Sequence, residues 1–154
     1  MKTAKITLRW LKSKGACRGG VEWFNAQEER GDIKLIEKLM IEKHFDWANW
    51  LIVRVMERKQ YLAYAIFAAR EVLRIFEKKY PNDNRPRKAI EAAEKCLADD
   101  SFAAWDAAWA AWDAAGAARD AAGDAARAAA GEEMQGKIIN YGIKLLNPAS
   151  EGGV

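Results

Sequence analysis

The feature that most constrains the fold of this chain is a run of four alanine-rich heptads over residues 103–130. The blocks read AAWDAAW, AAWDAAG, AARDAAG and DAARAAA. Alanine has the highest intrinsic helix propensity, and a seven-residue period keeps one set of side chains along one side of a helix. The repeat therefore predicts a long helix over about residues 101–130 and an all-α fold around it.

Two kinds of side chain follow the period of this predicted helix. Indoles occur on one side, at Trp105, Trp109 and Trp112. Carboxylates form a line beside them, at Asp106, Asp113 and Asp120. The indoles can fill a core or form a partner interface, and the carboxylates can form a solvated flank or meet Arg and Lys groups. Because the other faces are alanine, we expect the helix to lie centrally or to join two copies of the chain.

Helical periodicity and capping signals divide the rest of the chain into further helices. Short helices are predicted after Thr3 or Thr7, near Gly20 and after Asp32, which is expected to act as an N-cap. A clear apolar stripe predicts a helix over 61–80, and a turn then leads into a helix that starts at Pro86. With a last helix after Gly131, the chain is predicted to form a compact bundle of about seven or eight helices around the Ala-rich one.

The length of the chain fits one helical domain over residues 1–148, followed by a flexible tail over residues 149–154. No apolar run approaches the roughly 20 residues that cross a bilayer, and the first residues lack the pattern of a signal peptide. The two cysteines are far apart and have no Cys or His cluster nearby. A cytoplasmic protein without a disulfide framework or a zinc site is therefore expected.

Charge is distributed unevenly along the chain, although the net charge is only +3. Residues 1–60 contain 13 Lys and Arg against 8 Asp and Glu, whereas residues 101–154 contain 4 against 7. A nucleic-acid-binding protein usually has a larger basic excess and a recognisable module. We therefore expect a protein partner and no nucleic acid.

The best-defined basic group lies in the middle of the chain. Its candidate partner-binding residues are Arg70, Arg74, Lys78, Arg85 and Arg87, and Lys88 lies beside them. Glu71 and Glu77 lie among them, so one interpretation is a solvated, ion-paired helix face. The functional interpretation is a surface that steers an acidic protein toward this one.

No catalytic motif is present: the sequence contains no phosphate-binding GxxxxGK[ST], no HExxH and no GxSxG. Cys17 and His44 are the residues that an unfamiliar helical enzyme would use, and this is the enzymatic alternative. We expect no catalytic residue, no cofactor and no metal ion.

The segment YPNDNRPRKAIEAA at residues 80–93, followed by an alanine-rich helix, resembles the immunity proteins of bacterial toxin systems. The resemblance covers about residues 61–141, and Arg85, Pro86 and Arg87 match its motif. The Ala-rich segment carries Trp and Asp where that family often has histidines. The resemblance implies a non-catalytic inhibitor that binds and neutralises a toxin or effector. The alternative in the same class is a phage or mobile-element inhibitor of a host defence complex, of the anti-CRISPR kind.

Overall fold

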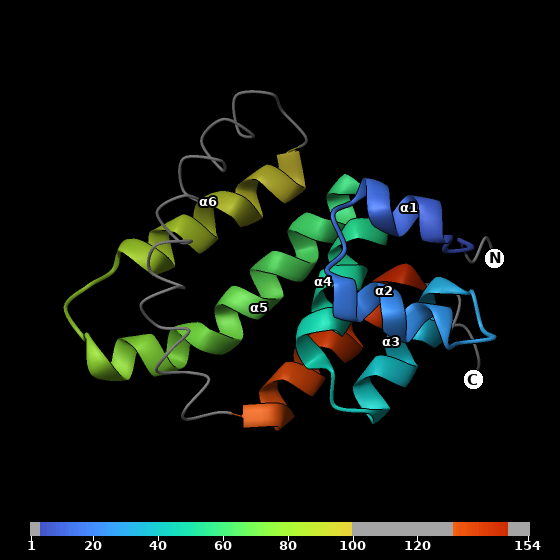
Figure 1. Cartoon of the computed structure of the whole chain (residues 1–154). Coiled ribbons are helices and arrows are strands. Elements are labelled where there is room, and N and C mark those ends of the chain that lie inside the picture. The colour runs from blue at the N-terminus through green and yellow to red at the C-terminus, as the bar shows by residue number, and fades with distance from the viewer. Residues whose placement is uncertain (1–3, 100–130, 148–154) are drawn as a thin grey trace, which may run out of the picture.

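The computed structural model describes residues 4–99 and 131–147, and in this part of the chain all regular structure is helical (Figure 1). The labelled helices are α1 (Leu8–Ser13), α2 (Arg18–Asn25), α3 (Asp32–Ile41), α4 (Phe45–Val55), α5 (Arg58–Lys79) and α6 (Arg85–Asp99). Another helix covers residues 131–146. The predicted all-α fold is therefore confirmed.

Several predictions fall outside the described residues. They are the long helix over 101–130, the indoles Trp105, Trp109 and Trp112, the aspartates Asp106, Asp113 and Asp120, and the tail over 149–154. Pairing of two copies through the alanine face stays a prediction for the same reason.

The first helix begins and ends as its sequence predicts. The side chain of Thr7 accepts a hydrogen bond from the backbone N–H of Trp10 at 3.1 Å and so caps the first turn of α1. After the helix, Gly15 adopts a φ of 73°, the left-handed conformation that a residue without a Cβ reaches most easily.

The expected N-cap role of Asp32 is wrong. Gly31 is the N-cap of α3, and Asp32 is the first helical residue and is buried. The backbone of Lys5 forms an isolated antiparallel bridge with Gly31, and this bridge places the carboxylate of Asp32 beside the segment before α1. There Asp32 accepts a hydrogen bond from the N–H of Ala4 at 3.2 Å. The segment before α1 is thus fastened to the start of α3.

The larger core cluster lies among α1 to α4, the first part of α5 and the 131–146 helix. Its fully buried aliphatic side chains are Leu35, Ile36, Ile52 and Ile139. Gly142 lets the 131–146 helix approach closely, because a Cβ there would lie 2.5 Å from Cδ1 of Ile52 and 2.7 Å from Cε2 of Tyr64. Tyr64 is buried at the same place, and its hydroxyl donates to Oδ1 of Asn49 at 2.6 Å.

The second half of α5 and all of α6 form a hairpin. A capping box between Glu57 and Gln60 starts α5, and Leu62 packs with Ile66, Ala93 and Leu97 between the two helices. The turn of the hairpin lies at the far side of the molecule from α1 and α2 (Figure 1). The hairpin therefore presents its turn and outer faces away from the larger core.

Candidate partner-binding site

The basic group predicted from the sequence lies on the α5–α6 hairpin. Between residues 70 and 95 there are eight cations and five carboxylates. Burial of Leu73 and Phe76 on α5 and of Ala89 and Ile90 on α6 turns the charged positions outward. Where each cation lies relative to the carboxylates decides which of them is available to a partner.

Two of the predicted cations connect the helices of the hairpin. Arg87 on α6 makes a bidentate ion pair with Glu77 on α5, with Nε and Nη2 each 2.8 Å from a carboxylate oxygen. Arg70 on α5 pairs with Glu94 on α6 and, through this hydrogen bond, lowers the pKa of that carboxyl. These two arginines hold α5 and α6 together.

A third predicted cation is engaged within the turn. Nη2 of Arg85 lies 2.6 Å from Oδ2 of Asp83, and its Nε lies 2.9 Å from Oδ1. Hydrogen bonds from the guanidinium and from the backbone N–H of Arg85 lower the pKa of Asp83 to about 2. The charges of Arg85 and Asp83 therefore cancel, and the pair adds no net charge to the turn.

The remaining predicted cations, Arg74 and Lys78, lie one turn apart on α5. Both are exposed, and neither makes an ion pair with another residue of the described ranges. Lys88 on α6 and Lys79 at the end of α5 are also exposed. The cation surplus of the hairpin thus resides in residues that do not hold the helices together.

Tyr80 gives this end of the hairpin an aromatic side chain. It is 47% exposed, which makes it one of two large hydrophobic side chains that stand out from the described surface. Its ring centroid lies 5.0 Å from that of Phe76, and the ammonium of Lys79 lies 5.6 Å from the ring centroid. In the sequence, Tyr80 is the last residue of the apolar stripe over 61–80, and nothing local marks it as exposed because its exposure depends on the turn that follows.

We define the hairpin tip as Arg74, Lys78, Lys79, Tyr80 and Lys88. An exposed aromatic ring among cations without carboxylate partners is suited to an acidic protein surface. Arg70, Arg85 and Arg87 flank this tip, and their charges are already engaged in ion pairs with Glu94, Asp83 and Glu77.

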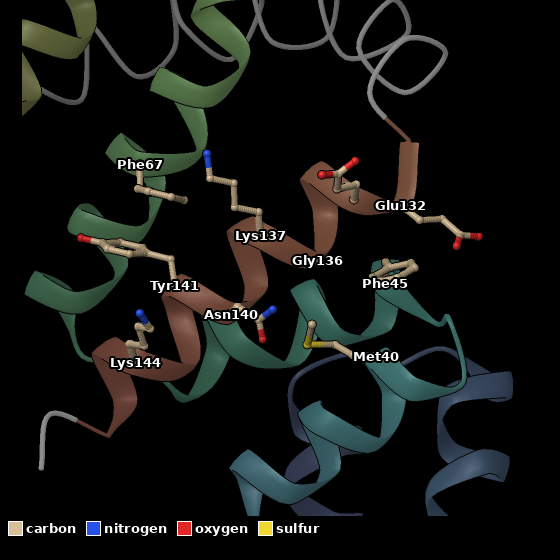
Figure 2. A pocket seen from close by; sticks show the side chains of 10 residues that line it. Met40, Phe45, Phe67, Glu132, Gly136, Lys137, Asn140, Tyr141 and Lys144 are labelled. Carbon is tan, nitrogen blue, oxygen red and sulfur yellow. The ribbon is translucent and has the colours of Figure 1, made fainter. Parts of the chain in front are cut away.

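A groove that the sequence did not predict runs along the outer face of the 131–146 helix (Figure 2). Its volume is about 690 Å³. Phe45 and Met40 line one side, and Phe67 of α5 lines the other and stacks on Tyr141 with ring centroids 4.0 Å apart. Its walls come from three separate parts of the chain, so no local pattern marks it.

Two of the polar side chains that line this groove form ion pairs with residues outside its lining: Glu132 pairs with Lys43 at 2.8 Å, and Lys137 pairs with Glu71 at 2.7 Å. Glu133, Asn140 and Lys144 also line it, so the groove has both aromatic and charged walls. Its lining residues include neither a cysteine nor a histidine.

Cys17 and His44, the residues of the enzymatic alternative, both occupy N-caps. Sγ of Cys17 accepts from the N–H of Gly20 at 3.4 Å at the start of α2. His44 precedes α4 and stacks on Trp47 with ring centroids 4.5 Å apart. The side chain of Cys17 thus caps a helix, and the ring of His44 packs on a neighbouring aromatic residue.

The described residues contain no group of three or more His, Cys, Asp or Glu side chains arranged to hold a metal ion. In the same part of the chain, no helix combines the length and the apolar character needed to cross a membrane.

Comparison with known proteins gives one match. No curated protein and no solved structure is significantly similar to this chain. The family model described as "Imm-5 like putative immunity protein" matches residues 52–132, which is more than half of the chain and contains the whole α5–α6 hairpin. The chain therefore belongs to this family of immunity proteins.

Proposed function

We propose that this protein is a non-catalytic inhibitor of the immunity type, which neutralises a toxin by binding it directly through the hairpin tip. The observation that carries the proposal is the position of the family match, because its described part centres on the hairpin. Inhibition by binding requires a surface and no reacting group, in keeping with a hairpin whose exposed face carries more cations than carboxylates.

The hairpin tip offers both long-range charge attraction and an aromatic contact to a partner. Unpaired cations at Arg74 and Lys78 attract an acidic partner and raise the association rate. Tyr80 adds an exposed aromatic side chain, the kind of residue that often dominates binding energy at an interface. The expected toxin surface is therefore acidic around a small apolar depression.

The ion pairs of the hairpin contribute pre-organisation. Arg70–Glu94 and Arg87–Glu77 fix α6 against α5 before the partner arrives, so less conformational entropy is lost on binding. Their loss is expected to affect stability first and affinity second.

The proposal is tested by co-producing the chain with toxins that the genes around the native gene are found to encode. Cells that produce the toxin are expected to grow when they also produce the wild-type chain. Protection should fail with the charge-reversed variant R74E/K78E and persist with K34E/K38E, which reverses two exposed lysines at the same spacing on α3. Full protection by R74E/K78E would contradict the assignment of the tip.

The alternative of a phage or mobile-element inhibitor predicts a different result. The chain would then fail to protect against any neighbouring toxin and would restore phage growth in cells that carry the defence system. That outcome would replace the immunity role while leaving a protein-binding function in place.

A further inference from the structure

A second charged surface lies outside the segment matched by the family model. Residues 1–21 contain six Lys and Arg and no Asp or Glu. In the described part of this segment, Lys5, Arg9, Lys12 and Lys14 are exposed and make no ion pair with any described residue. Arg18 is the exception, since it pairs with Glu22 at 2.7 Å. We call Lys5, Arg9, Lys12 and Lys14 the α1 cations.

The segment that carries these cations, which is α1 and the residues beside it, is held firmly. Leu11 and Ile6 are buried in the larger core. The N–H of Ile6 donates to the carbonyl of Arg30 at 2.8 Å, and Thr7 caps the helix. The charged face of α1 is therefore presented by a fixed backbone and needs no ordering when a partner binds.

Part of this arrangement of charge is unfavourable for the fold, although Lys12 in the last turn of α1 interacts favourably with the helix dipole. Arg9 and Lys12 are three residues apart on one helix, so their like charges repel each other. The first turn of α1 also lacks an acidic residue, which would interact favourably with the helix dipole. A concentration of cations that weakens the local structure is typical of a surface kept for binding.

We propose that the α1 cations form a docking surface for an acidic segment of a protein, separate from the hairpin tip. Figure 1 places α1 and the α5–α6 turn at opposite sides of the molecule, so one small partner cannot cover both. This inference does not depend on the toxin, because it rests only on the residues before α2 and their anchoring.

Charge and size favour a protein segment over a nucleic acid. The six residues of α1 rise only about 9 Å along the helix axis, which matches a few carboxylates of an extended peptide. A longer polyanion would also run over the carboxylate-rich parts of a chain whose net charge is only +3.

The test uses the full chain labelled with ¹⁵N and a capped peptide of eight glutamates as the probe. At low ionic strength, we expect the amide signals of residues 5–18 to shift on titration. In R9E/K12E these shifts should need about tenfold more peptide, while the signals of the hairpin respond as in the wild type. R74E/K78E is the matched control, and it should keep the shifts of residues 5–18.

The melting temperature of a neutralised variant shows whether a loss of peptide binding comes from the missing charges or from a folding defect. R9Q/K12Q should melt close to the wild type, because it removes both the repulsion between the two cations and the favourable interaction of Lys12 with the helix dipole, and it should also need more peptide than the wild type to shift the signals of residues 5–18. The proposal is overturned if the peptide shifts no signal of residues 5–18, or if R9E/K12E shows these shifts at the same peptide concentrations as the wild type. It is also overturned if an eight-nucleotide single strand binds the same residues more tightly than the peptide.

Discussion

Arg87 and Glu77 join the two helices of the hairpin by a bidentate ion pair in which both nitrogen-to-oxygen distances are 2.8 Å. The side chains are 48% and 31% exposed, so solvent screens the pair. A double-mutant cycle with R87Q and E77Q should give a coupling free energy of about 0.2–1 kcal/mol in urea unfolding. A value near zero would show that the pair does not stabilise the hairpin.

Gly142 permits the contact of the 131–146 helix with the core. Gly142→Ala is expected to lower the free energy of unfolding by about 1–3 kcal/mol, because the new Cβ would lie within 2.8 Å of both Ile52 and Tyr64. Gly136→Ala in the same helix is the matched control, since its Cβ would lie 4.0 Å from the ring of Phe45. The control should leave stability unchanged or raise it by up to about 1 kcal/mol through helix propensity. Equal effects of the two substitutions in denaturant unfolding would contradict the packing described.

Tyr64 makes stability depend on pH in the alkaline range. Burial raises the pKa of its phenol above the ordinary value, because a buried phenolate loses its hydration. The folded state therefore releases this proton at higher pH than the unfolded state. The stabilisation is complete below pH about 10, the pKa of an unperturbed tyrosine, and is lost progressively above it.

The variant Y64F isolates this effect. It should cost about 1 kcal/mol at neutral pH, where the hydrogen bond to Asn49 is lost, and the difference from the wild type should shrink above pH about 10. The measurement is the urea midpoint of both proteins across pH. A difference that stays constant up to pH about 11 would show that the phenol is not protected by burial.

Lys43 has a φ of 62°, which favours glycine. Lys43→Gly should raise the melting temperature by a few degrees, because the ion pair that it loses with Glu132 is exposed at both ends. Lys43→Ala keeps the unfavourable φ and loses the ion pair, so it should lower the melting temperature. A lower melting temperature for the glycine variant would show that the ion pair outweighs the backbone strain.

Much of the helical fold could be predicted because its signals are local. Thr7 and Gly15 mark the ends of α1, and the apolar stripe through Leu62, Leu73 and Phe76 indicates α5. Asp32 was assigned wrongly because an N-cap and a buried carboxylate look alike in sequence. Its role depends on Ala4, a residue 28 positions away.

The sequence groups the cations of the hairpin, but it does not separate the ion-paired cations from the free ones, and it does not mark Tyr80 as an exposed side chain. Spacing groups Arg70, Arg74 and Arg87, but whether a cation is free depends on which carboxylate the second helix brings to it. Glu94 lies 24 residues from Arg70. Similarly, Gly142 lies close to Ile52 and Tyr64, which are distant from it in the sequence, so no local pattern predicts this contact.

The central claim is that Arg74 and Lys78 contact the toxin, and it is tested most directly by the affinity of the purified pair. We expect R74E/K78E to lower the affinity at least tenfold, mainly through slower association, and K34E/K38E to change it little although it alters the net charge equally. Circular dichroism would verify that both variants are folded. Equal affinities for the wild type and R74E/K78E would contradict the account.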